Sequence, residues 1–185
     1  MNIENYNNKN QSKIIFITGG TKSGKSEFAE HLAKSLNTIT YIALSEERPE
    51  DDNWNKKISL HRKRRPKSWK LIETTNLLTS LNIEKGPLLI DSIGGFVMEN
   101  IDICNSEWMK KMTLLIDLLQ KRISLTIIVG EQVGWGLVSE YQIGNTYIER
   151  IGELQKKITR ISRDNWLAIN GRAIKIDDIS LEIPN

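Results

Sequence analysis

The chain reads IIFIT from Ile14 to Thr18 and continues directly as GGTKSGKS from Gly19 to Ser26. The first part is a short run of mainly β-branched residues, which is typical of a buried strand. The second part fits GxxxxGKS, the P-loop pattern, and the residues from Lys25 toward Leu36 favour a helix. A glycine loop between strand and helix turns its backbone N–H groups inward, and the helix N-terminus adds positive potential. The stretch therefore predicts a site for nucleotide phosphates.

Two residues of this loop and one farther along the chain have predicted roles in that site. We expect Lys25 to reach the β- and γ-phosphates and the Ser26 hydroxyl to bind Mg²⁺. Asp91 closes the apolar run that begins at Pro87. A carboxylate after a buried strand can hold Mg²⁺ near a P-loop, although many strands end in an aspartate that only forms a turn.

The remaining apolar patterns alternate between strands and helices. Further strands are expected at 39–44, 69–74 and 125–129, and helices at 51–61, from Ser106 as N-cap to 119, and at 148–161. Gly130, Gly134, Gly136 and Gly144 are expected to punctuate a loop. The dipeptide Asn170-Gly171 between two apolar runs is typical of a two-residue hairpin. The sequence thus predicts an α/β fold with a mainly parallel sheet, helices on both faces and a C-terminal antiparallel hairpin.

Length and composition set the frame for this fold. A chain of 185 residues is long enough for one domain, so we expect a disordered tail over residues 1–13 and a single domain over 14–185. The net charge of +3 gives no indication of nucleic-acid binding, and no apolar run approaches the length of a membrane span. Cys104 is the single cysteine, which favours a reducing cytoplasm.

A histidine stands beside the densest basic run of the chain. His61 precedes Arg62, Lys63, Arg64 and Arg65. The simplest interpretation is the solvated basic end of a helix that Pro66 terminates. Nearby cations would also lower the imidazole pKa, so that a neutral, nucleophilic ring could attack phosphorus while the arginines bind a triphosphate. The residues alone leave both interpretations open.

These motifs together resemble one enzyme family. The P-loop is followed by HxxxRPxxWxxxE from His61 to Glu73, by LIDS from Leu89 to Ser92, and by VGWGLV from Val133 to Val138. In this order they are similar to the adenosylcobinamide kinase / adenosylcobinamide-phosphate guanylyltransferase family, and the similarity runs from about Ile14 to Ile176.

The resemblance implies a P-loop NTPase (RecA-like) fold and a bifunctional enzyme of cobalamin assembly. Such an enzyme phosphorylates adenosylcobinamide with ATP or GTP, and then transfers GMP from GTP through a guanylylated histidine. It also implies a homotrimer and, on the matching positions, that His61 carries GMP. The resemblance places in the nucleotide site Gly19, Gly20, Thr21, Lys22, Ser23, Gly24, Lys25, Ser26, Ser45, Glu46, Arg62, Lys63, Arg64, Arg65, Glu73 and Asp91.

The chain departs from the family pattern at a few positions. Glu131-Gln132 stands where the family has Asn-Glu before Val-Gly, and Ile148 and Gln155 replace an arginine and an asparagine. Ser139 stands where a proline is common. We expect these positions in acceptor binding or in subunit contacts.

Two other functions remain open from the sequence. A P-loop kinase for another hydroxyl compound would use Lys25 and Asp91 but leave His61 idle. A GTP-binding regulatory protein without catalysis is the other, but the sequence lacks the guanine-reading NKxD motif.

Overall fold

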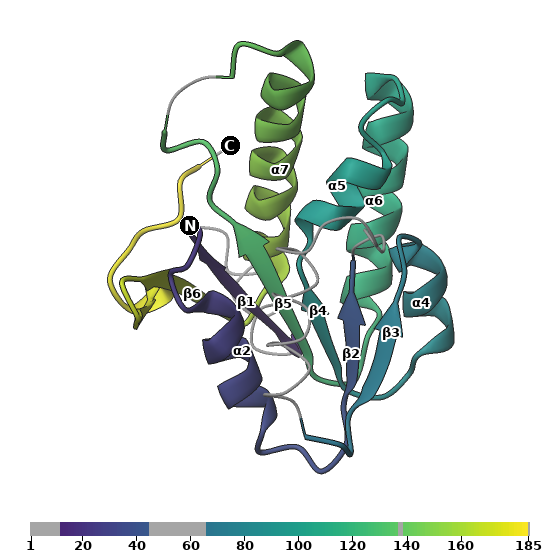
Figure 1. Cartoon of the computed structure of the whole chain (residues 1–185), viewed down its shortest axis with the longest axis vertical. Coiled ribbons are helices and arrows are strands. Elements are labelled where there is room, and N and C mark those ends of the chain that lie inside the picture. Colours follow the sequence, from purple (N-terminus) through teal and green to yellow (C-terminus); the bar gives the residue numbers. More distant parts are fainter. Residues whose placement is uncertain (1–11, 45–65, 137–138, 185) are drawn as a thin grey trace, which may run out of the picture.

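The chain is built around one β-sheet. The structure is a computed structural model, of which we describe residues 12–44, 66–136 and 139–184. Within these ranges seven strands form a single sheet in the order β3-β2-β4-β5-β1-β6-β7 (Figure 1). All neighbouring strands are parallel except β6 and β7. The predicted α/β class, the parallel sheet and the terminal hairpin are therefore confirmed.

The seven strands are short, and β1, β2, β4 and β5 are almost fully buried. Their bounds are β1 Ile14–Gly19, β2 Thr40–Ala43, β3 Lys70–Glu73, β4 Leu88–Asp91, β5 Thr126–Glu131, β6 Asp164–Ile169 and β7 Arg172–Lys175. Strand β1 lies between β5 and β6, and β5 separates it from β4. Because parallel strands end at the same edge, Gly19, Asp91 and Glu131 all lie at the carboxyl edge of the sheet.

Alternate side chains of the strands form two apolar layers, one on each face of the sheet. Phe16, Ile42 and Ile90 pack on one face against helices α4 Leu77–Ile83, α5 Gly94–Glu99, α6 Asn105–Gln120 and α7 Gln142–Ile161. Ile17 and Tyr41 pack on the other face against α2 Lys25–Ala33. Figure 1 shows these helices around the sheet, and helices on both faces are thus confirmed.

A buried arginine joins α7 to the connection between α5 and α6. Arg150 is only 6% exposed, and its guanidinium donates to the carbonyl oxygens of Asn100, Ile101 and Ile103. The guanidinium also lies 5.3 Å from the centre of the Trp108 ring. The planar fork of an arginine can serve several carbonyl groups at once, which an ammonium group cannot do in the same geometry. Arg150 therefore fixes α7, which begins beyond the carboxyl edge.

The C-terminal hairpin has the predicted turn. Ile169 pairs with Arg172, and the two residues between them have positive φ angles of 49° at Asn170 and 74° at Gly171. Asn and Gly are the residues that adopt this left-handed conformation most readily. A 3₁₀ turn, Ile176–Asp178, follows β7.

Three details differ from the sequence-based expectation. Helix α6 begins at Asn105 with Cys104 in the N-cap position, so Ser106 lies inside the first turn and the predicted cap is wrong. Gly130 belongs to β5 and Gly144 to α7, so only Gly134 and Gly136 lie in the expected loop. All three errors arise because glycine and serine are turn residues on average, whereas packing against the sheet extends the strand and the helices.

None of the helices in the described ranges combines the length and the apolarity that crossing a bilayer requires.

Candidate nucleotide and metal site

The P-loop connects the carboxyl end of β1 to the start of α2, as predicted. Neighbouring backbone holds it in place, because the Gln132 N–H donates to the Gly19 carbonyl at 3.0 Å and the Gly171 N–H donates to the Ser23 carbonyl at 3.0 Å. Lys22 and Gly24 have positive φ angles of 58° and 95°. Such a loop leaves successive N–H groups free to face a bound anion.

The structure brings together the three residues that were expected to act on phosphate and metal. Lys25 Nζ donates to the Gly20 carbonyl at 3.2 Å, so its charge lies across the loop. Ser26 Oγ donates to Asp91 Oδ1 at 3.3 Å. A hydroxyl and a carboxylate at this separation match the oxygen ligands with which a P-loop protein holds Mg²⁺ beside the phosphates.

The same carboxylate has a second partner that the sequence reasoning missed. The Tyr41 hydroxyl donates to Asp91 Oδ2 at 2.5 Å. No group of three or more His, Cys, Asp or Glu side chains with metal-site geometry occurs among the described residues. A magnesium ion held by Ser26 and Asp91 would therefore complete its shell with nucleotide phosphates and water.

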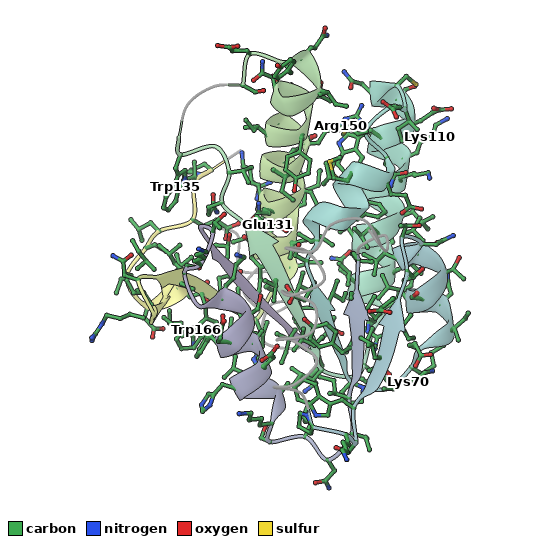
Figure 2. All side chains as sticks on the ribbon, viewed as in Figure 1. Lys70, Lys110, Glu131, Trp135, Arg150 and Trp166 are labelled. Atoms are coloured by element: carbon green, nitrogen blue, oxygen red, sulfur yellow. The ribbon has the colours of Figure 1, made fainter. Side chains whose placement is uncertain are left out.

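Glu131, at the end of β5, is a further carboxylate beside the loop, which sequence reasoning treated only as a departure from the family pattern (Figure 2). One oxygen accepts a hydrogen bond from Ser92 Oγ, and the other accepts from the Gly94 N–H at 3.2 Å. Burial raises the pKa of this carboxyl group, and the charge of Asp91 raises it further, against the opposing effects of Ser92 and Lys25. The signal that could have identified Glu131 is the one that identified Asp91, a carboxylate at the end of a buried strand.

Two of the departures, Gln132 and Gln155, bind the residue that precedes the P-loop. Gln132 Nε2 donates to Thr18 Oγ1 at 3.0 Å, and that hydroxyl donates to Gln155 Oε1 at 2.8 Å. Gln155 Nε2 in turn donates to the Glu131 carbonyl at 2.8 Å. Thr18 immediately precedes Gly19, so both side chains bind the residue that leads into the P-loop, and their expected contacts with an acceptor or a subunit stay a prediction. Gln132 follows β5 and Gln155 lies on α7, so residues far apart in the sequence meet at the end of β1. The sequence alone does not show this proximity.

The other predicted residues divide into two groups. Glu73 ends β3 and is exposed, and the register aligns it with Ala43 and then Asp91 across two strand spacings, or roughly 10 Å. Outside the described residues lie Ser45, Glu46, His61, Arg62, Lys63, Arg64 and Arg65, together with the expected helix at 51–61.

Trp135 lies beyond β5 on the loop that carries the family-like VGWGLV segment, and 70% of its surface is exposed (Figure 2). Trp108 is buried and Trp166 packs edge-on against Phe28 at 5.1 Å, as expected of packing residues.

Comparisons with known proteins identify the family that the motifs resemble. A family model described as "Cobinamide kinase / cobinamide phosphate guanyltransferase" matches residues 15–176. The bifunctional adenosylcobalamin biosynthesis protein CobU of Escherichia coli (strain K12) is 26% identical over 181 residues, which cover 88% of this chain and 99% of that protein. CobP of Pseudomonas aeruginosa, a protein with the same description, is 28% identical over 148 residues, which cover 77% and 84% of the two chains.

Solved structures agree on the fold alone. An ATPase from the type III secretion system of pathogenic bacteria matches with a TM-score of 0.53 at 12% identity, over 83% of this chain and 50% of that one. The ATPase EscN from enteropathogenic E. coli matches with a TM-score of 0.50 at 13% identity, over 86% and 43%. The chain thus spans half or less of the length of these ATPases.

The close packing of the first P-loop glycine predicts a stability effect. A Cβ atom at Gly19 would overlap the Ala168 carbonyl oxygen, which belongs to backbone and cannot move aside cheaply. We expect Gly19→Ala to lower the free energy of unfolding without nucleotide by about 1–3 kcal/mol. Urea denaturation measures this. Gly20→Ala is the control, because a Cβ there has no neighbour within 4 Å. Equal stability of Gly19→Ala and wild type would contradict the packing argument.

The raised pKa of Glu131 predicts a pH dependence. An acid whose pKa in the folded protein exceeds its ordinary value of 4.5 makes stability fall as pH rises from that value to the folded-state pKa. Glu131→Gln removes this loss, so the variant should gain stability over wild type as pH increases and show no gain below the ordinary value. Denaturation at several pH values tests this, with the exposed Glu140→Gln as control. A stability gain of Glu131→Gln over wild type that is largest at low pH would contradict this prediction.

Proposed function

Because a family model covers residues 15–176, the chain belongs to the cobinamide kinase / cobinamide phosphate guanyltransferase family, and we propose that it catalyses both reactions in cobalamin biosynthesis. The observation that carries the proposal is the Ser26–Asp91 hydrogen bond beside the P-loop lysine, because it sets a metal-binding pair next to a phosphate-binding loop. The substrates would be adenosylcobinamide and ATP or GTP.

In the first reaction, the P-loop binds the triphosphate while a hydroxyl of adenosylcobinamide attacks the γ-phosphorus. The bond to the β-phosphate oxygen breaks, the hydroxyl loses its proton, and the nucleoside diphosphate leaves. Lys25 offsets negative charge on the β- and γ-phosphates as the bond breaks. Ser26 and Asp91 would hold Mg²⁺, which when bound neutralises charge on the same phosphates.

In the second reaction, we propose that His61 is the nucleophile. A ring nitrogen attacks the α-phosphorus of GTP, and pyrophosphate leaves. The phosphate of adenosylcobinamide phosphate then attacks the same phosphorus, which frees His61 and yields adenosyl-GDP-cobinamide. Two displacements let one nucleotide site serve both activation and delivery to a bulky acceptor.

The family membership supports this role, and the sequence places His61 in the connection between β2 and β3. The described chain leaves the carboxyl edge of the sheet at Leu44, just after β2, and resumes at Pro66 before β3. His61 and the basic run thus belong to the segment that connects the carboxyl edge of the sheet, where Asp91 and the P-loop lie, to the start of β3 at the opposite edge. Ser45, Glu46, the basic residues at 62–65 and Glu73 are proposed to complete the nucleotide site.

The homotrimer, the single domain over 14–185 and the cytoplasmic location stay predictions.

Guanylylation tests the second reaction directly. After incubation with α-labelled GTP and Mg²⁺ and denaturation, the protein should carry label through an acid-labile, base-stable phosphoramidate. His61→Ala should carry none. His31→Ala is the matched control, because His31 is the only other histidine and lies exposed on α2, so it should be labelled as wild type is. A plain kinase or a passive GTP-binding protein would not be labelled, and label on His61→Ala would refute the assignment.

Transfer of γ-label to adenosylcobinamide tests the first reaction. Lys25→Ala should reduce kcat by at least about 100-fold, since a charge-stabilising donor at the transferred phosphate is lost. Lys34→Ala, at the exposed C-cap of α2, should leave the rate unchanged. Undiminished transfer by Lys25→Ala would remove the P-loop from the reaction.

A further inference from the structure

The carboxylate of Asp91 is held at both of its oxygens by side chains from two different elements. Ser26, in the first turn of α2, donates to Oδ1 at 3.3 Å, and Tyr41, on β2, donates to Oδ2 at 2.5 Å. Tyr41 lies two residues before Ala43, the register partner of Asp91. Side chains at positions two apart share a face of the sheet, so the long tyrosine ring reaches along β2 to the carboxylate on β4.

The ring of Tyr41 is fixed by its surroundings. Only 1% of its surface is exposed, and it lies in the apolar cluster beneath α2. The Trp69 ring stacks on it at 6.4 Å with an angle of 24° between the planes. A tyrosine packed in this way presents its hydroxyl from one place, and a buried hydroxyl requires a polar partner. The hydroxyl therefore acts as a fixed donor aimed at one oxygen of Asp91.

The carboxylate oxygen that accepts from Tyr41 determines which oxygen of Asp91 stays available to a cation. A carboxylate group otherwise rotates freely, because its terminal torsion is broad and has no single preferred angle. With Oδ2 bound to Tyr41, the group is held with Oδ1 toward Ser26, the other proposed metal ligand. A cation would then meet one oriented oxygen and not a rotating pair.

Two effects of the Tyr41 hydrogen bond on a cation oppose each other. Donation to Oδ2 withdraws charge from the carboxylate, which weakens its attraction for a cation, whereas fixing the group removes the entropy cost of orienting it. Removal of residues that orient metal ligands typically lowers metal affinity about 10–100-fold, so orientation outweighs the loss of charge.

We propose that Tyr41 is a positioning residue, which sets the carboxylate of Asp91 so that Oδ1 and the Ser26 hydroxyl bind the magnesium ion of the nucleotide complex. The proposal rests on the magnesium site of the proposed function. Tyr41 touches neither phosphate nor metal in this role, and it acts through Asp91.

Metal binding tests the role without reference to turnover. Mn²⁺, observed by electron paramagnetic resonance, is titrated into the protein saturated with a GTP analogue whose β–γ bridge cannot be hydrolysed. Tyr41→Phe keeps the ring and loses the hydroxyl, and its affinity for Mn²⁺ should fall about 10–100-fold. Its affinity for the analogue in the presence of EDTA should not change. Tyr141→Phe, at an exposed tyrosine, is the matched control and should bind Mn²⁺ as wild type does.

The Mg²⁺ dependence of the kinase reaction gives a second reading. Tyr41→Phe should need about 10–100-fold more Mg²⁺ for half-maximal rate and should recover the wild-type kcat at saturating Mg²⁺. A role in packing alone would instead lower the melting temperature and the metal-free nucleotide affinity, with no separate change in the Mg²⁺ requirement. That result, or unchanged Mn²⁺ affinity in Tyr41→Phe, would overturn the proposal.

A double-mutant cycle with Asp91→Asn shows whether Tyr41 acts through Asp91. In the Asp91→Asn background, Tyr41→Phe should cause no further loss of Mn²⁺ affinity, and an undiminished loss there would overturn the proposal. If wild type itself shows no metal-dependent nucleotide binding, the magnesium site of the proposed function fails together with this role. If wild type binds Mn²⁺ and Tyr41→Phe binds it equally well, only the role of Tyr41 fails.

Discussion

The contact on which the site depends is the packing of the P-loop against backbone from both neighbouring strands. The Gln132 N–H, just after β5, binds the carbonyl of Gly19, and the Gly171 N–H, in the β6–β7 turn, binds the carbonyl of Ser23. Because both partners are backbone groups next to the ends of strands, the protein itself supplies contacts that shape the loop. Binding a nucleotide to a preformed loop has a smaller entropy cost of ordering, so more of the interaction energy is available to stabilise charge that develops during transfer.

This constraint also explains why the polar residues behind the loop form a closed chain of hydrogen bonds. Thr18 and Gln155 are 5% and 6% exposed, so an unpaired amide or hydroxyl there would cost free energy. Each amide is matched to a partner, from Gln132 through Thr18 and Gln155 to the backbone of Glu131. The chain departs from its family at three of these positions and nevertheless keeps the polar groups paired.

Most of the fold could be predicted because its signals are local. The apolar runs of β1 and β5, the spacing in α7 and the Asn170-Gly171 turn each depend on neighbours in sequence. Lys25, Ser26 and Asp91 were found because a known pattern joins them. Tyr41 was missed because it sits in an apolar run and looks like a core residue, and only the register of β2 and β4 brings its hydroxyl to Asp91. The contact of Gln155 with Thr18 was missed for the same reason, since Gln155 reaches Thr18 from α7.

The geometry of the edge bears on how one site could serve two reactions. The P-loop grips the β- and γ-phosphates, so the attack on the γ-phosphorus and the attack on the α-phosphorus must come from different positions on one triphosphate. Asp91 and Glu131 end strands β4 and β5, and Leu44, the last described residue before the segment with His61, lies just after β2 on the other side of β4. A single loop can hold the triphosphate for both reactions, with the choice made by which nucleophile is present.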